Sequence, residues 1–166
     1  MKKFTTDIIS EHLVKVKYNN LPKDVIEKAK ICILDSIECT LGGSATNIGK
    51  IVINSPIAKE CGNSTIFGHK KKTSLTSAVF INSTLSNILD FDDTYIGHPG
   101  ATIVPVALNI AEYTNACGKD LITAIILAYE ISIRIGLALR PATEERKYVH
   151  GHGTCKYLVR QRLPVK

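Results

Sequence analysis

The chain has 166 residues, of which 45% are hydrophobic and 22% are charged, and its formal net charge is +6. A chain of this length and composition can bury a substantial core, which excludes an intrinsically disordered or fibrous protein. No uninterrupted apolar run reaches the ~20 residues of a membrane span, and the first residues lack the apolar core of a signal peptide, so we expect no membrane partner.

The positive charge is concentrated near the C-terminal end of the sequence. Four basic residues without an acidic neighbour follow Thr154, namely Lys156, Arg160, Arg162 and Lys166. Subtracting these four charges from +6 leaves +2, which is ordinary for a globular domain. We therefore expect no nucleic-acid partner.

Five cysteines are scattered along the chain without a C-x-x-C pair, at positions 32, 39, 61, 117 and 155. An odd and unclustered set is typical of reduced thiols rather than of a disulfide framework. We therefore expect a cytoplasmic protein and assign no cysteine to a metal site or to catalysis.

Apolar periodicity predicts three helices in the first 60 residues. The first is capped by Thr5 or Thr6 and ends near Asn19–Asn20, the second runs from Pro22 to a stop at Gly42–Gly43, and the third covers 47–60, where Pro56 must kink or divide it. The side chains expected to face the core are Ile8, Ile9, Leu13 and Val16 in the first helix, and Val25, Ile26, Ala29, Cys32, Ile33, Ile37 and Leu41 in the second.

The second half adds a short strand and three further helices. Residues 64–68 are the only strand-like segment, a long helix runs from about Thr73 to Leu89, another opens at Pro105 and runs to Ala116, and the most apolar helix covers 121–139. Because this last helix is apolar on every side, we expect it at the centre of the bundle, with Glu130 and Arg134 paired there. The predicted fold class is all-α, a helical bundle with at most one very short strand.

The segment after the long helix combines acids, a hydroxyl and an imidazole. It contains Asp90, Asp92, Asp93 and Thr94, and then His98 within a turn formed by Gly97, Pro99 and Gly100. Acids at the C-terminal end of a helix oppose its dipole, which favours a proton-transfer site over a packing role. The same residues could instead end one helix and cap the next, and spacing alone does not decide between these readings.

Several segments match the motifs of a known family in the same order along the chain, namely Leu21–Pro22, Ile33–Ile37, Leu41–Gly43, Thr65–Gly68, Asn82–Thr94, His98–Gly100, Gly118–Leu121, Ala128–Glu130, Val149–His150 and Gly153–Thr154. Together they resemble the N-terminal part of the MmgE/PrpD family, which includes 2-methylcitrate dehydratases, cis-aconitate decarboxylases and iminodisuccinate epimerases. The long segment from Asn82 to Thr94 is the most specific part of this resemblance.

The resemblance implies an active site formed by Asp90, Thr94, His98 and His150, to which we add Asp93 as a second substrate-binding residue beside Thr94. It implies that Asp90, His98 and His150 are catalytic and transfer a proton next to a substrate carboxylate, without metal or organic cofactor. The expected substrate is a small carboxylate resembling a tricarboxylate, such as 2-methylcitrate for dehydration or cis-aconitate for decarboxylation. The expected assembly is a homodimer.

After Gly153–Thr154 the chain departs from the family, which continues into further helices and a second α/β domain. We divide the chain into an incomplete helical domain, residues 1–154, and a divergent basic tail, residues 155–166, which has the character of a frameshift or truncation. We therefore expect no turnover from the isolated chain. Two alternatives stay open: a non-catalytic helical fragment that partners a full-length relative, and a metal-binding protein using the Asp cluster, His98 and the pair His150 and His152.

Overall fold

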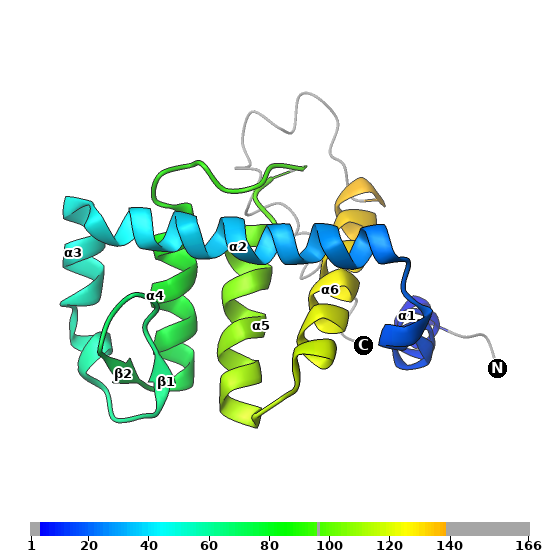
Figure 1. Cartoon of the computed structure of the whole chain (residues 1–166), viewed down its shortest axis with the longest axis horizontal. Coiled ribbons are helices and arrows are strands. Elements are labelled where there is room, and N and C mark those ends of the chain that lie inside the picture. The colour runs from blue at the N-terminus through cyan, green and yellow to red at the C-terminus, as the bar shows by residue number, and fades with distance from the viewer. Residues whose placement is uncertain (1–3, 96, 139–166) are drawn as a thin grey trace.

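The computed structural model describes residues 4–95 and 97–138, and these form a helical assembly with one small hairpin. The elements are α1 (Thr5–Lys15), η1 (Tyr18–Asn20), α2 (Lys23–Ala45), α3 (Asn47–Ile53), η2 (Pro56–Lys59), β1 (Ser64–Thr65), β2 (Lys72–Thr73), α4 (Leu75–Asn87), α5 (Gly100–Thr114) and α6 (Gly118–Ala138). Helix α2 runs across α3, α4, α5 and α6, which stand side by side along it, and α6 extends past α2 on both sides (Figure 1). The predicted all-α fold class is confirmed.

The contact of α2 with α4 explains why α2 is longer than predicted. Helix α2 continues through Gly43 to Ala45, so the predicted stop at Gly42–Gly43 is wrong. A Cβ atom on Gly43 would lie 2.0 Å from the carbonyl oxygen of Leu85 in α4, so this glycine permits close approach of two backbones instead of ending a helix. Nearby, the hydroxyls of Ser36 and Ser86 lie 3.2 Å apart in the buried interface.

Small and polar side chains, rather than the predicted large ones, fill the C-terminal half of this interface. The buried residues of α2 are Ile26, Ala29, Ser36, Cys39, Thr40 and Gly43, whereas Leu41 is 44% exposed. The prediction of a buried Leu41 is therefore wrong, because close packing on α4 rotates the small residues inward. The buried hydroxyl of Thr40 is satisfied by donating to the carbonyl of Ser36 at 2.7 Å.

The hairpin is anchored on α4 and α5 by two buried asparagines. Strand β1 pairs with β2 in antiparallel register, and β2 is a strand that the sequence did not predict. The Asn82 side chain accepts from the Phe67 N–H at 2.9 Å and donates to the Thr65 carbonyl at 2.9 Å and to Asn109 Oδ1 at 2.8 Å. These hydrogen bonds pair backbone groups that have no partner in a neighbouring strand, because the two strands are so short.

Two other predictions concern the ends of helices. Pro56 divides the third predicted helix as expected, because α3 ends at Ile53 and η2 starts at Pro56. Helix α5, in contrast, begins at Gly100 and carries Pro105 inside it, so the prediction that Pro105 opens this helix is wrong. The earlier start is stabilised because the Gly100 N–H, one of the unsatisfied donors of the first turn, donates to Asp93 Oδ1 at 2.8 Å.

Helix α1 lies at one end of the assembly and is poorly buried (Figure 1). It contains no buried residue, and Ile8, predicted to face the core, is 56% exposed. The N-cap is Phe4, whose N–H donates to the Asp7 carboxylate at 2.9 Å, and neither Thr5 nor Thr6 caps the helix.

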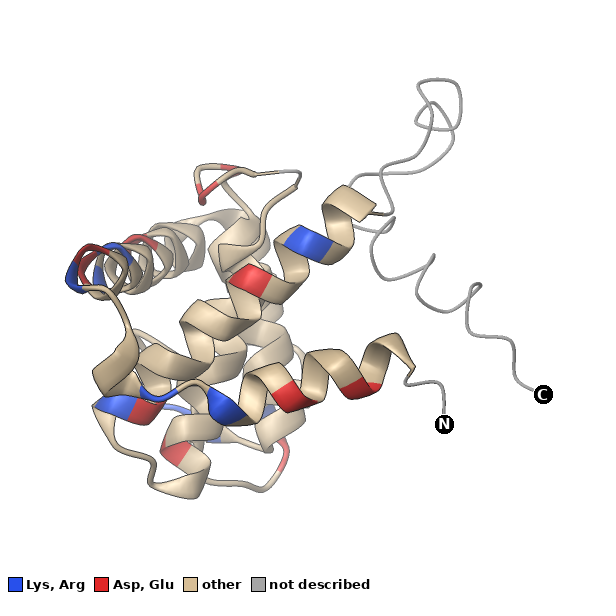
Figure 2. Cartoon of the chain, turned by 90° about the vertical axis from the view of Figure 1, so that its right-hand side faces the viewer, with Lys and Arg blue, Asp and Glu red and all other residues tan. Residues whose placement is uncertain are grey.

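Helix α6 lies at the edge of the described assembly, which corrects the prediction of a central position (Figure 2). Its only buried residues are Ile125 and Gly136. Glu130 and Arg134 do pair, but at the surface, since their side chains are 43% and 74% exposed. Among the described residues, α6 is the one helix whose length and apolar composition would be enough to cross a membrane. Core helices of soluble proteins meet the same criterion.

Candidate functional site

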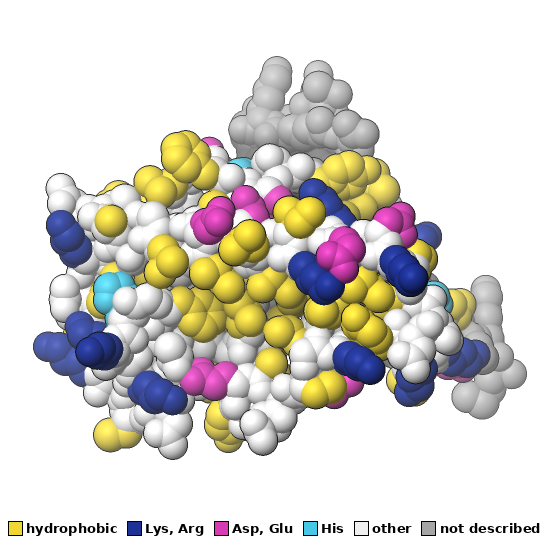
Figure 3. Space-filling model, viewed as in Figure 1, with side chains coloured by type: hydrophobic (Ala, Val, Ile, Leu, Met, Phe, Trp, Pro, Cys, Tyr) yellow, Lys and Arg dark blue, Asp and Glu magenta, His cyan; other side chains and the backbone are white. Residues whose placement is uncertain are grey.

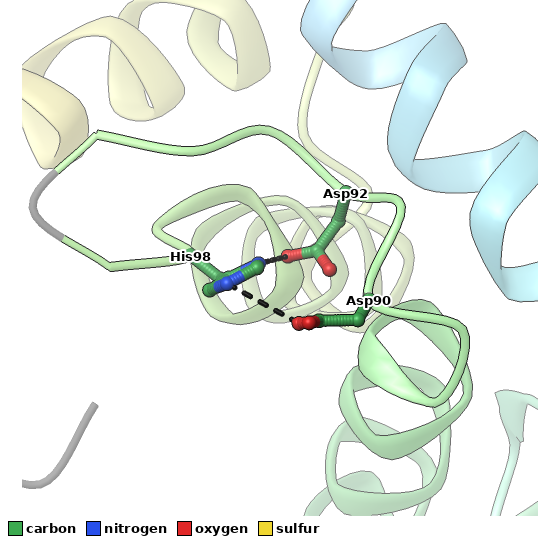
Figure 4. A group of neighbouring side chains, drawn as sticks. All are labelled: Asp90, Asp92 and His98. Atoms are coloured by element: carbon green, nitrogen blue, oxygen red, sulfur yellow. Dashed lines mark ion pairs between the residues drawn. The ribbon is translucent and has the colours of Figure 1, made fainter. Parts of the chain in front are cut away.

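The segment after α4 turns sharply because Asp90 adopts a left-handed backbone conformation. Helix α4 ends at Asn87, and Asp90 follows with φ of 56°, a region that aspartate tolerates better than most residues other than glycine. The Asp90 N–H donates to the Asn87 carbonyl at 3.0 Å, which closes the turn. As a result, the carboxylates of Asp90 and Asp92 both face the later residue His98 (Figure 4).

His98 is held between these two carboxylates. Its Nε2 lies 3.3 Å from Asp90 Oδ1, and its Nδ1 lies 3.2 Å from Asp92 Oδ2 (Figure 4). Each ring nitrogen thus lies within ion-pair distance of a different carboxylate, so a proton on this ring would be shared between two acids. The Asp92 side chain is 1% exposed and also accepts from Asn87 Nδ2 at 3.0 Å, whereas the Asp90 side chain is 78% exposed.

Asp93 makes its contacts away from His98, within the protein. Its Oδ1 accepts from the Gly100 N–H at 2.8 Å and its Oδ2 accepts from the Tyr129 hydroxyl of α6 at 2.7 Å. A Cβ atom on Gly100 would lie 2.2 Å from Asp93 Oδ1, so any other residue there would displace the Asp93 carboxylate. Burial, together with the hydrogen bond to Asp93, raises the pKa of Tyr129 well above its ordinary value, so this hydroxyl remains a donor at neutral pH.

Asp93 and Thr94 line a cavity of about 720 Å³ that lies between α2 and α6, which we call the α2–α6 cavity. Its lining is mostly apolar and also includes Cys32 and Tyr129, but neither His98 nor Asp90. Burial raises the pKa of the Cys32 thiol, which keeps it protonated. The predicted residues therefore fall into two adjacent places, His98 with Asp90, and Thr94 with Asp93.

His150, the remaining predicted catalytic residue, lies outside the described residues, and so does His152. Asp92 was predicted only as a member of the acid segment, without a catalytic or substrate-binding role, and Tyr129 only as part of the apolar last helix, although both contact the site. Asp92 could have been identified from the sequence, because it lies two residues after Asp90 in the same acid segment. Tyr129 lies 36 residues from Asp93 in the sequence, and no local pattern connects them.

The same cluster offers a donor set for a metal ion. Within 4–95 and 97–138, the one group of this kind is Asp90, Asp92 and His98, whose ligand atoms lie within 4.8 Å of one another. Carboxylate oxygens and an imidazole nitrogen suit zinc or manganese. Asp93, part of the predicted metal set, is not in this group, because both its oxygens accept hydrogen bonds elsewhere.

Residues 7–159 match the family model described as the MmgE/PrpD N-terminal domain, and the chain belongs to this family. Among curated proteins it is similar to the cis-aconitate decarboxylase of Mus musculus, with 27% identity over 89% of this chain and 31% of the relative. It is also 27% identical to the enzymes named cis-aconitate decarboxylase from Homo sapiens, over 81% of this chain and 29% of the relative, and from Aspergillus terreus, over 73% and 26%.

The chain thus spans less than a third of the length of these relatives. No solved structure matches it significantly. The shared region contains the segment Asp90–Thr94 and His98, so the His98 cluster belongs to the part of the chain that the family match covers.

Proposed function

We propose that this chain contributes the proton-transfer part of an MmgE/PrpD lyase site, with His98 as the acid and base. The observation that carries the proposal is the pairing of both His98 ring nitrogens with Asp90 and Asp92, at 3.3 and 3.2 Å. The two acids stabilise the imidazolium and fix the plane of the ring, as an orienting carboxylate does for other catalytic histidines. His150 remains a proposed second catalytic group.

The proposed substrate is a small carboxylate of the tricarboxylate class, in keeping with the relatives named cis-aconitate decarboxylase. In a decarboxylation the bond to the carboxyl carbon breaks, carbon dioxide leaves, and the carbon that keeps the electron pair takes a proton from the His98 imidazolium. In a dehydration such as that of 2-methylcitrate, His98 would instead remove a proton from carbon, while the leaving hydroxyl takes a proton from a second acid, proposed as His150, and departs as water. Thr94 would donate a hydrogen bond to a substrate carboxylate, beside Asp93.

Charge supports the further proposal that the chain alone turns over no substrate. Asp90, Asp92 and Asp93 lie within four residues and repel an anionic substrate, and His98 offers a single positive charge against them. A tricarboxylate therefore needs additional cationic groups, which we propose come from the part of the family sequence that this chain does not cover. The proposed chemistry assigns no step to a metal ion or to an organic cofactor.

A chimera tests this proposal with its own controls. The aligned region of the mouse cis-aconitate decarboxylase is replaced by this chain, and carbon dioxide release from cis-aconitate is measured. His98→Ala should reduce the rate about 10²–10⁴-fold, the range typical of a general acid or base. His69→Ala, in the loop between the two strands, is the matched control and should leave the rate unchanged. A chimera that works equally well with His98→Ala would refute the role of His98.

A metal-binding function is the second candidate, favoured by the 4.8 Å grouping of Asp90, Asp92 and His98. If a metal ion acts, EDTA should abolish the activity of the chimera and Zn²⁺ or Mn²⁺ should restore it. Under the proton-transfer proposal the activity persists in EDTA. The proposed setting is the cytoplasm, with a homodimer as the assembly and no nucleic-acid or membrane partner.

A further inference from the structure

Asn87 stands where a rigid helix meets the irregular segment that carries the site. It is the last residue of α4, and the two residues before it, Leu85 and Ser86, are fully buried. The described residues between Asn87 and Gly100 form no helix or strand, so no regular backbone pattern fixes their side chains. The orientation of the carboxylates in this segment therefore depends on individual contacts with the rigid part of the fold.

Two hydrogen bonds connect Asn87 to the two acids that face His98. Its carbonyl oxygen accepts from the Asp90 N–H at 3.0 Å, and its side-chain Nδ2 donates to Asp92 Oδ1 at 3.0 Å. The first bond joins backbone atoms and forms with any residue at this position, whereas the second requires a donor side chain. A substitution of Asn87 therefore removes the bond to Asp92 and leaves the turn at Asp90 in place.

The bond to Asp92 sets the direction of a buried carboxylate. The Asp92 side chain is 1% exposed, so its oxygens depend on protein donors, and a carboxylate without them is costly. Because a carboxylate is planar, holding Oδ1 on Asn87 also determines where Oδ2 points. That oxygen lies 3.2 Å from His98 Nδ1 (Figure 4). The contacts thus run in a line from Asn87 through Asp92 to the imidazole.

The Asn87 side chain differs from that of an asparagine that merely ends a helix. A helix-ending asparagine often adopts the left-handed conformation, but the left-handed residue after α4 is Asp90. Asn54, which follows α3, bonds its own helix, because its Nδ2 donates back to the Lys50 carbonyl at 2.8 Å. The Asn87 amide instead reaches five residues forward, to Asp92. Its bond serves the site rather than the end of the helix.

A neutral donor suits this position better than a cation. An amide holds the Asp92 carboxylate without cancelling its charge, whereas a lysine or arginine would compete with His98 for it. The surface charge follows the same pattern on the face shown in Figure 3, where Lys and Arg side chains gather at the hairpin end of the molecule and Asp and Glu side chains lie over the middle of α2.

We propose that Asn87 is a positioning residue of the site, which keeps the Asp92 carboxylate turned toward His98. The inference rests on the proposed role of His98 as acid and base, and Asn87 acts on it only through Asp92. A misplacement of about 1 Å at a catalytic group can cost about 100-fold in rate. Loss of the Asn87 amide should therefore lower kcat by about 10–100-fold and change KM by less than about 3-fold.

Steady-state kinetics of the chimera of this chain with the mouse cis-aconitate decarboxylase test the proposal. Asn87→Leu has a similar volume without the amide and should show the full loss in kcat. Asn87→Gln keeps an amide, and its kcat should lie closer to that of the parent chimera. Asn54→Leu is the matched control, since it removes a helix-end amide bond outside the site, and it should leave kcat unchanged.

A double-mutant cycle distinguishes positioning from a general effect on folding. In a chimera that already carries Asp92→Ala, adding Asn87→Leu should lower kcat by less than about 2-fold further, because the contact through which Asn87 acts is gone. Equal losses in the two backgrounds would overturn the proposal, and so would an Asn87→Gln chimera as slow as Asn87→Leu.

A second measurement needs no catalysis. The full 166-residue chain is labelled on histidine with ¹³C, its His98 signals are assigned by their absence from His98→Ala, and the order parameter of the ring is measured by NMR relaxation. Asn87→Leu should lower it from the range of rigid groups, about 0.85, to below about 0.6, and Asn54→Leu should not change it. A His98 ring that stays rigid in Asn87→Leu would overturn the proposal. A ring that becomes mobile, in a protein whose chimera tolerates His98→Ala, would support the positioning contact and refute the proposed function instead.

Discussion

Removing the hydroxyl of Tyr129 should loosen the segment that carries His98. Tyr129→Phe deletes one hydrogen bond, from a half-buried phenol to the Asp93 carboxylate at 2.7 Å, and leaves the ring packing intact. A hydrogen bond to a charged group contributes about 1.5–3 kcal/mol, and partial exposure reduces this, so we expect a loss of about 1–2 kcal/mol in the free energy of unfolding. Urea unfolding followed by circular dichroism at pH 7 measures it.

A double-mutant cycle separates this bond from other effects of the substitution. Asp93→Ala removes the bond to Tyr129 and also the bond to the Gly100 N–H, so it should cost more than Tyr129→Phe. Once Asp93 is alanine, adding Tyr129→Phe should cost less than about 0.5 kcal/mol. Tyr113→Phe, on a 69% exposed tyrosine of α5, is the control and should cost less than about 0.5 kcal/mol. Equal losses from Tyr129→Phe in both backgrounds would refute the pairing.

The same tyrosine has a pH signature. The pKa of Tyr129 is raised in the folded state, chiefly by burial, so above its ordinary value near ~10 the unfolded chain loses this proton while the folded chain keeps it. The unfolded state then binds fewer protons, and stability falls by up to about 1.4 kcal/mol per pH unit from this group. The stability difference between wild type and Tyr129→Phe should therefore be constant below pH ~9 and shrink above ~10.

Three further predictions concern packing and thiols. Asn82→Ala leaves the Phe67 N–H and the Asn109 amide oxygen without these partners, and should lower the free energy of unfolding in urea by about 2–5 kcal/mol. A loss below about 1 kcal/mol would mean that water replaces the side chain. Gly43→Ala should destabilise by about 1–3 kcal/mol because its Cβ meets the Leu85 carbonyl, whereas Gly42→Ala, facing a flexible side chain, should be neutral or stabilising. With Cys155→Ser removing one thiol, Ellman's reagent at pH 8 should distinguish two classes: fast for the exposed Cys61 and Cys117, and at least about 10-fold slower for Cys32 and Cys39, whose pKa burial raises.

The main features of the site were predictable because they are encoded locally. Asp90 and His98 are eight positions apart, so the turn between them brings them together without help from distant elements. The end of α4 before the acids also follows from local sequence. Asp92 was predicted as a member of the acid segment and of the metal alternative, but not as a partner of His98, although the same turn directs its carboxylate there.

What the sequence could not supply are the contacts between distant segments. The bond from Tyr129 to Asp93 depends on how α6 packs, and it turns Asp93 toward the protein interior. The start of α5 at Gly100 depends on the same carboxylate, which offers an acceptor that no cap within the helix provides. Strand β1 is similarly held by asparagines from α4 and α5, which donate to the Thr65 carbonyl.

The sequence alone determined the all-α class, the division of the third helix at Pro56, and the cluster of acids around His98, since each depends on backbone limits or on neighbours along the chain. Only the tertiary structure decided that α2 passes through Gly43 and that α6 lies at the edge. Both depend on which surfaces pack together. A glycine has the same sequence signal whether it ends a helix or lets two helices approach, and an apolar helix has the same signal at the centre of a bundle or at its edge.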